Sequence, residues 1–184
     1  MIFRFFFRLF GWKLTGAIPI EVNQAIYVVC PHNKWLDFPI GLGVRASMRR
    51  KVGYLGKAEL FKPPFGFIFR LLGGTPVFRT EKRDMVAAQV EAIKSTSGSF
   101  AIAPEGTRKN VGKLKSGFYH MAYGAGIPII MVGFDLVKKE GVVGEPFMPS
   151  GDFKADMKQY FVPFFEKIGG FQKDWIQNYK NGIF

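Results

Sequence analysis

Cysteine and histidine are scarce in this sequence, and their scarcity excludes several kinds of site. The 184 residues contain one cysteine, Cys30, which excludes an internal disulfide and a cysteine-rich metal site. The two histidines, His32 and His120, leave almost no material for a histidine-based zinc site. We therefore expect a protein that holds no metal ion.

Long apolar runs are also missing. No stretch approaches the ~18–20 apolar residues that a membrane-spanning helix needs. The longest candidate, residues 121–134, is interrupted by Gly124, Gly126 and Pro128. The first ten residues lack a small-residue cleavage site, which argues against a secretory signal peptide. These absences favour a peripheral protein that sits on the cytoplasmic face of the cell membrane without crossing it.

Acidic residues are few beside basic ones. The chain has 14 Asp and Glu against 26 Lys and Arg, a net charge of +12 at pH 7, and 21 of its residues are Phe. A hydrophobic content of 48% excludes an intrinsically disordered chain, and the length suits one domain. A basic, Phe-rich protein suits an anionic membrane surface. No nucleic-acid-binding motif is recognisable, so we expect no nucleic-acid partner.

The first ten residues predict an amphipathic helix. At 100° per residue, Arg4 and Arg8 lie about 40° apart and opposite a broad apolar face. That face contains Ile2, Phe3, Phe6, Phe7, Leu9 and Phe10. Such a helix is ~15 Å long, enough to lie in the membrane plane but not to span it. The alternative is a terminal helix packed on the protein's own core. We accordingly divide the chain into a membrane-associating segment, 1–16, and a globular domain, 17–184.

Expected strands alternate with expected helices along the rest of the chain. The strands cover residues 25–30, 52–56, 75–78, 100–103 and 127–134, and the helices cover 38–48, 65–72, 82–94 and 117–123. A hairpin is expected around residues 138–141, followed by a helix from about Asp152 that bends or ends near Pro163. This order predicts a single α/β domain with a largely parallel or mixed central sheet flanked by helices. Ligands of such sheets gather at the loops beyond the strand ends.

The first loop of interest, residues 31–39, directly follows the expected strand that ends at Cys30. Prolines at its two ends disfavour a continuous helix, so a turn can fold Asp37 back beneath His32. A carboxylate there would fix the imidazole tautomer, and the imidazole could take a proton from a substrate hydroxyl. The alternative is that Asp37 caps the following helix. Cys30 could act as a nucleophile, but a lone thiol at a buried strand end more often serves packing.

The second loop of interest, residues 103–108, follows the expected strand that ends at Ala103. It contains Glu105, Gly106, Thr107 and Arg108, a tetrapeptide that is rare by chance. The glycine lets a ligand approach the backbone, and the arginine offers a planar fork suited to phosphate. Glu105 could orient an arginine or bond a substrate hydroxyl. The alternative is a solvated turn with a surface ion pair. Arg79 and Lys57, near the ends of two other strands, are weaker candidates for anion binding.

Four motifs resemble those of the lysophospholipid and glycerolphosphate acyltransferases, and they follow one another along the chain in the order found in that family. The His-x4-Asp motif matches His32 and Asp37, and the Glu-Gly-Thr-Arg motif matches residues 105–108. A Gly-rich strand that ends in arginine matches residues 73–79, and an apolar strand that begins at proline matches 128–132. The resemblance runs from about Tyr27 to Gly133 and implies that 17–184 is an acyltransferase domain.

The resemblance also implies the reaction and the roles of the residues. A fatty acyl group would pass from acyl-CoA or acyl carrier protein to the free hydroxyl of a lysophospholipid, most simply lysophosphatidic acid. His32 would be the general base and Asp37 its orienting partner, with no metal, cofactor or covalent intermediate. Arg79 and Arg108 would hold the acceptor's phosphate. The remaining residues implied for substrate binding are Glu105, Gly106, Thr107 and, by its position, Lys57.

Two alternative functions remain open at this point. The same basic and aromatic surface fits a lipid-binding protein that has no catalytic activity. A different head group, such as that of an amino-acid lysolipid, fits the same catalytic pair. An enzyme of the 1-acylglycerol-3-phosphate acyltransferase type is the interpretation that we carry forward.

Overall fold

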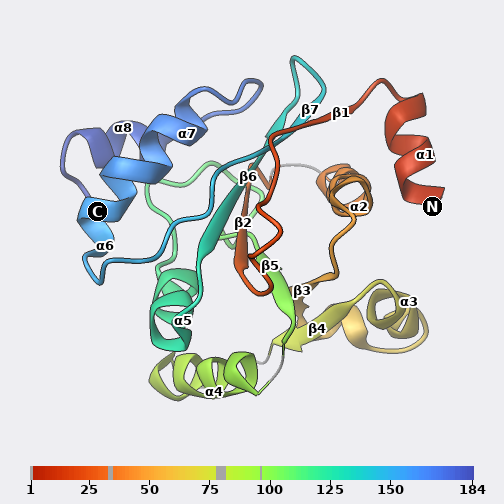
Figure 1. The fold of residues 1–184 in the computed structure, drawn as a ribbon, viewed down its shortest axis with the longest axis horizontal. Helices are drawn as coiled ribbons and strands as arrows, with labels where there is room; N and C mark the ends of the chain where they lie inside the picture. The colour runs from red at the N-terminus through yellow and green to blue at the C-terminus, as the bar shows by residue number, and fades with distance from the viewer. Residues whose placement is uncertain (1, 33–34, 78–81, 96) are drawn as a thin grey trace.

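A mixed, largely parallel sheet forms the centre of the molecule (Figure 1). The computed structural model describes residues 2–32, 35–77, 82–95 and 97–184, without the side chains of residues 57, 77 and 82–85. In these residues the strands are β1 (Lys13–Thr15), β2 (Ile26–Cys30), β3 (Val52–Lys57), β4 (Gly74–Val77), β5 (Ser99–Ile102), β6 (Ile129–Asp135) and β7 (Glu140–Val143). They lie in the order β1-β7-β6-β2-β5-β3-β4. Neighbours are parallel apart from the β6–β7 hairpin, which confirms the expected fold class.

Helices cover both faces of this sheet. They are α1 (Ile2–Leu9), α2 (Asp37–Met48), α3 (Gly66–Leu71), α4 (Lys82–Lys94), α5 (Gly117–Ala125), α6 (Phe153–Asp156), α7 (Val162–Glu166) and α8 (Asp174–Lys180), with a 3₁₀ turn η1 (Ala58–Phe61) and a π-helical turn η2 (Met157–Phe161). In Figure 1, α1 and α2 lie on the right of the sheet, α4 to α8 lie on the left, and α3 lies beside the edge strand β4.

The central strands divide the core into two clusters. Ile26, Val28 and Cys30 of β2 pack against α5 and the C-terminal helices, whereas Tyr27 faces the cluster that contains α1 and α2. Successive side chains of a strand point to opposite faces, so one apolar strand serves both clusters. Every residue of β6 is buried for the same reason. Because both faces of these two strands are buried, their sequences are near-continuous apolar runs and do not alternate between apolar and polar residues.

The expected N-terminal helix is present as α1, but its apolar residues face two ways. Phe7 is 5% exposed and packs on α2 at Gly43, where a Cβ would lie 2.5 Å from the Phe7 ring. The large apolar residues that α1 and its C-terminal end leave exposed are Ile2, Phe5, Phe6, Leu9 and Phe10. The helix thus combines packing on the core with an exposed apolar surface. No described helix has the length and apolar character needed to cross a membrane.

The C-terminal segment is more elaborate than the single helix expected. The Asp152 carboxylate accepts the Lys154 and Ala155 N–H groups and so caps α6, close to the expected start. The π-helical turn η2 then precedes Pro163, which lacks the N–H that a regular helix would use at that position. The later helix α8 was not expected. Its residues Trp175 and Tyr179, four apart, share one face and are fully buried.

Candidate active site

Two loops meet at the carboxyl end of the parallel strands. β2 ends at Cys30 and β5 ends at Ile102, and these strands are parallel neighbours with Val28 opposite Ile102. Parallel neighbours end at the same edge of a sheet, so the loop that contains His32 lies beside the loop that contains Glu105 (Figure 1). The topology therefore brings together the two segments that the sequence singled out.

The side chains of His32 and Asp37 meet at the start of α2. His32 Nδ1 lies 3.9 Å from Asp37 Oδ2, which is within ion-pair reach but too long for a hydrogen bond. The His32 side chain is 34% exposed and that of Asp37 is 1% exposed, so the carboxylate lies buried behind an accessible imidazole. Leu36 is the N-cap of α2 and Asp37 is its first residue. The alternative interpretation of Asp37 as the helix cap is therefore wrong.

The surroundings of His32 favour a neutral imidazole. Desolvation by burial lowers the pKa of His32 from its usual 6.5. The negative charge of Asp37 raises this pKa, but it does not offset burial, and the positive charge of Arg108 lowers the pKa further. With Nδ1 turned toward Asp37, Nε2 is the nitrogen left to accept a proton. The geometry thus gives a base that is already deprotonated at neutral pH.

Glu105 is buried and holds the backbone of His32. Glu105 is 5% exposed, and its Oε2 accepts the His32 backbone N–H at 2.6 Å. Burial raises the pKa of Glu105 to about 7, although the hydrogen bond from His32 acts in the opposite direction. The nearby charge of Asp37 raises this pKa as well. Glu105 was expected at the site, but its contact with the His32 backbone was not predictable, because no local sequence pattern relates the two loops.

Gly106 allows a lysine to cross the loop. Its φ of +64° is a conformation that favours glycine, and a Cβ at this position would lie 2.5 Å from Lys115 Nζ. The Lys115 backbone N–H donates to the Pro104 carbonyl at 2.9 Å, which fixes this second lysine-bearing segment against the loop. In the sequence, Lys115 belonged to a basic run with no feature that distinguished it from its neighbours. The structure brings its cation to the site.

Thr107 and Arg108 are exposed at the same place. The Thr107 hydroxyl accepts the Lys109 backbone N–H at 3.3 Å, which supports the turn. The Arg108 side chain is exposed, and its charge acts on the pKa of His32. A ligand that reaches the imidazole therefore also comes within the field of this guanidinium.

The side chains of the other two candidate binding residues are not described by the structure. Lys57 is the last residue of β3, at the same edge of the sheet, but its side chain is not described. Arg79 lies outside the described residues, as does the end of the Gly-rich strand that was expected to reach it. Their proposed contacts with phosphate remain predictions.

Cys30 has the environment of a core residue. It is fully buried, and burial raises the pKa of its thiol well above the usual 9.0. The charge of Glu105 raises this pKa further. A thiol held protonated and out of reach of solvent is a poor nucleophile. This environment supports packing as the role of Cys30.

The described residues place a candidate base, His32, near an exposed cation, Arg108. They contain no group of three or more His, Cys, Asp or Glu side chains that could hold a metal ion. His32 can accept a proton, Asp37 can stabilise the imidazolium that results, and Arg108 can bind an anionic group. A substrate that carries both a hydroxyl and a phosphate matches these three functions.

Comparisons with known proteins agree on one family. A model of the Acyltransferase family matches residues 12–135, which include both loops. A 1-acyl-sn-glycerol-3-phosphate acyltransferase of Haemophilus influenzae is 30% identical over 138 residues, covering 68% of this chain and 55% of the relative. The enzyme of that name from Salmonella typhimurium is 30% identical over 133 residues, covering 67% of this chain and 53% of the relative. This chain thus spans about half the length of these curated relatives.

The solved structures include one with a similar fold. The crystal structure of the 1-acyl-sn-glycerophosphate (LPA) acyltransferase PlsC from Thermotoga maritima matches with a TM-score of 0.57. The match covers 90% of this chain and 74% of that protein, at 21% sequence identity. At this level of identity the likeness supports the fold alone.

Proposed function

The chain belongs to the Acyltransferase family, and we propose that it transfers a fatty acyl group to the free hydroxyl of a lysophospholipid. The donor is a thioester, either acyl-CoA or acyl carrier protein, and the simplest acceptor is lysophosphatidic acid. The observation that carries this proposal is the accessible His32 imidazole, backed by the buried Asp37 carboxylate and next to Arg108. The names of the relatives support the same acceptor class.

The proposed reaction needs a base and alignment of the two substrates. As the acceptor oxygen attacks the thioester carbonyl, its proton passes to His32 Nε2, and the negative charge of Asp37 stabilises the imidazolium. The tetrahedral intermediate then collapses, the carbon–sulfur bond breaks, and the thiolate leaves with the proton from His32. A thioester is already activated, so the enzyme supplies mainly the base and the orientation. The products are a diacyl phospholipid and a free thiol.

The direct test is incubation of the purified protein with labelled acyl-CoA and a panel of lysolipids, with products identified by mass spectrometry. Formation of a diacyl lipid together with free CoA supports the proposal. A panel that includes lysophosphatidic acid, lysophosphatidylcholine and an amino-acid lysolipid separates the head groups. The same panel is repeated with acylated acyl carrier protein as the donor. A lipid-binding protein without catalytic activity would bind the lipids and release no thiol from either donor, and that result would overturn the proposal.

Arg108 is expected to bind the phosphate of the acceptor, together with Arg79, Gly106 and Thr107. We predict that Arg108→Ala raises KM for lysophosphatidic acid about tenfold or more and changes KM for acyl-CoA much less, because a charge-assisted contact to phosphate is lost. Steady-state kinetics with each substrate varied in turn measures both constants. The matched control is Lys109→Ala, which removes a neighbouring exposed cation. Equal changes in the two KM values would contradict this assignment.

We also propose that the protein works at an anionic membrane surface, to which α1 and α3 bind. Besides the exposed residues of α1, the α3 residues Phe67, Ile68 and Leu71 are 58%, 41% and 81% exposed. These three lie within about 100° of the helix circumference. Phe69, on the opposite side of α3, packs against Phe38 with ring centroids 5.9 Å apart. Apolar groups this exposed on a soluble surface commonly mark a contact with a partner or a membrane.

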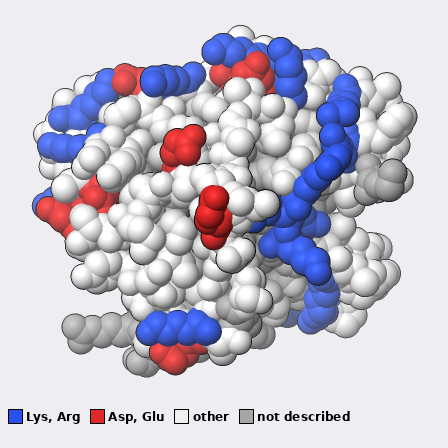
Figure 2. Space-filling model, in the orientation of Figure 1, with Lys and Arg blue, Asp and Glu red and all other residues white. Residues whose placement is uncertain are grey.

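The position of these surfaces relates them to the candidate active site. α1 packs on α2 at Gly43, and α3 contacts α2 at Phe38, next to Asp37. A bilayer that contacts both α1 and α3 would therefore hold the start of α2 at a fixed distance from the membrane surface. Figure 2 shows lysine and arginine side chains in a band over this side of the molecule. The band complements anionic head groups, and the apolar residues complement the region below them.

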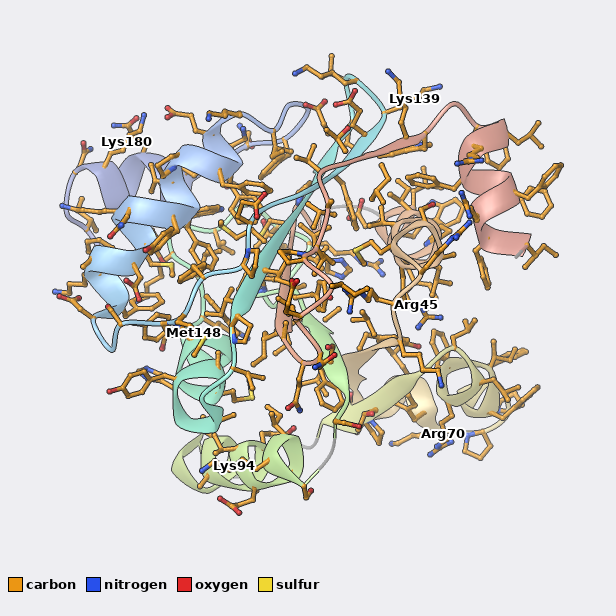
Figure 3. The ribbon with its side chains drawn as sticks, viewed as in Figure 1. Arg45, Arg70, Lys94, Lys139, Met148 and Lys180 are labelled. Carbon is orange, nitrogen blue, oxygen red and sulfur yellow. The ribbon has the colours of Figure 1, made fainter. Side chains whose placement is uncertain are left out.

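A probe on α3 tests this contact. Cys30 is the single cysteine and is fully buried, so an environment-sensitive fluorophore on Leu71→Cys would report from that position alone. We predict a blue shift of its emission when vesicles that contain phosphatidylglycerol are added, because the probe leaves water. The control is Met148→Cys, a 56% exposed residue on the side of the molecule opposite Arg70 of α3 (Figure 3). Identical responses of the two probes, or none at Leu71, would contradict the contact.

A further inference from the structure

A cleft of about 540 Å³ lies between α1, β1 and the end of α2, apart from the candidate active site. Its polar lining consists of Arg4, Arg8, Lys13 and Ser47, and Trp12 contributes an aromatic wall. Its volume falls within the range of about 300–1,000 Å³ that is usual for small-molecule sites. None of the lining residues is acidic, so the cleft is suited to an anion.

Two buried polar atoms of this cleft have no hydrogen-bond partner among the described residues. They are Nε of Arg4 and Oγ of Ser47. Buried donors of this kind are nearly always paired in folded proteins, because an unpaired one loses its hydrogen bonds to water without replacement. Both atoms can donate a hydrogen bond, and both belong to residues that line the same cleft. An anion bound at this cleft would supply oxygen acceptors for such donors.

The surrounding charges strengthen this argument. Arg8 lies one helical turn from Arg4, on the same flank of α1. Lys13 pairs with Glu140 at 3.6 Å but remains 71% exposed, so its charge is only partly compensated. Lys139, at the tip of the β6–β7 hairpin, reaches the Phe10 carbonyl at 3.4 Å at the end of α1 (Figure 3). The cleft therefore lies in a region of positive potential.

Apolar groups adjoin the cationic ones. A second hollow, of about 440 Å³, is lined by Arg4 and Arg8 together with the exposed residues Phe5 and Leu9. The two arginines thus separate a polar cleft from an apolar surface. A lipid has this same arrangement, with a charged phosphate joined to acyl chains.

We propose that the cleft binds the phosphate group of an anionic lipid, with its acyl chains along Phe5 and Leu9. The Arg4 guanidinium and the Ser47 hydroxyl donate to the phosphate oxygens, and Arg8 and Lys13 neutralise the remaining charge. This lipid is bound in addition to the acyl acceptor, because the cleft is separate from Arg108. It would fix α1, and with it α2, against a membrane that contains anionic lipid.

Trp12 provides a local readout for the test. In a Trp35→Phe background, Trp12 lines the cleft and the remaining tryptophan, Trp175, is fully buried. We expect short-chain dihexanoylphosphatidic acid to change the tryptophan emission saturably. The apparent Kd should rise about tenfold or more in Arg4→Gln and in Ser47→Ala. The net-neutral dihexanoylphosphatidylcholine should produce no saturable change, and inorganic phosphate should bind more weakly. If inorganic phosphate bound as tightly as the lipid, the assignment to a lipid would be overturned.

Control variants separate binding from folding. Ser47→Ala removes a hydroxyl that has no hydrogen-bond partner in the described part of the chain, so its Tm without ligand should equal or exceed that of the parent protein. Arg49→Gln removes an exposed cation outside the cleft and should leave the Kd unchanged. Unchanged Kd values in both Arg4→Gln and Ser47→Ala would overturn the proposal.

The acyl acceptor site is tested separately in the same proteins. Arg108→Ala should leave the Kd reported by Trp12 unchanged, because Arg108 does not line the cleft. A loss of lipid binding in this variant would overturn the second site. Acyl transfer to a soluble short-chain acceptor reports on the proposed function alone, so the two proposals can fail independently.

Discussion

Replacing His32 with alanine is expected to slow acyl transfer about 10²–10⁴-fold while the protein remains folded. The imidazole is 34% exposed, so its removal leaves no large cavity, and its proton-accepting nitrogen is lost. Release of CoA thiol from acyl-CoA in the presence of lysophosphatidic acid measures the rate. Far-UV circular dichroism and thermal unfolding establish that the variant is folded. Turnover near the wild-type level in a folded His32→Ala protein would contradict the role of base.

The chain supplies two matched controls for this prediction. His120, the other histidine, is exposed on α5 and lies outside the candidate active site, so His120→Ala should retain the wild-type rate. Cys30→Ala should show no loss of chemistry beyond what reduced stability explains, because its thiol is buried and protonated. A rapid burst of acyl-enzyme that disappears in Cys30→Ala would instead indicate a covalent mechanism.

The pH dependence of the rate tests the same assignment. Burial lowers the pKa of His32 below 6.5, so the rate should rise as pH increases through a midpoint below 6.5. It should rise again near pH 7, as the Glu105 carboxyl that holds the His32 backbone ionises, and then level off. Asp37→Asn removes a charge that raises the pKa of His32, so the first midpoint should move to lower pH. The plateau should also fall, because the imidazolium loses its stabilising partner.

The strands and helices were largely predictable from the sequence because their patterns are local. The apolar runs of β2 and β6 and the alternation of strands with helices indicated a parallel sheet. The order of strands was not predictable, since it depends on pairing between residues far apart in the chain. β1, with three residues, is too short to give a periodic signal. Trp175 and Tyr179 of α8 are a pair at helical spacing, but seven residues gave too weak a pattern.

The candidate site was likewise predictable from the sequence only in part. The spacing of His32 and Asp37 and the rare tetrapeptide at residues 105–108 identified both loops, and the sheet brings them together. The bond from the His32 N–H to Glu105 and the place of Lys115 over Gly106 were not predictable. Each joins segments whose relative position is set by the tertiary fold. Sequence patterns identify which residues carry the chemistry, whereas burial and orientation require the folded chain.

Glu105→Gln is expected to make the protein more stable and less active at pH 8. Burial raises the pKa of Glu105 from 4.5 to about 7, so the folded state binds more protons than the unfolded state between these values. The stability of the wild-type protein therefore falls as pH rises from about 4.5 to 7, by about 3 kcal/mol for this group. A neutral glutamine avoids this loss. Its amide oxygen can still accept the His32 N–H, but more weakly than a carboxylate does.

Urea unfolding of both proteins at pH 5 and pH 8 measures the difference. We expect the gain in free energy of unfolding to be small at pH 5, where the wild-type side chain is protonated in the folded state, and largest at pH 8. The exposed Glu145→Gln is the matched control and should show no such pH dependence. The acyl-transfer rate of Glu105→Gln at pH 8 should fall about tenfold, because the backbone of His32 is held less firmly. A role confined to structural stability predicts that rate and stability change in the same direction. Higher stability together with a lower rate would therefore identify Glu105 as a positioning residue, retained although its burial destabilises the protein. Equal stability of the two proteins at pH 8 would contradict the predicted destabilisation.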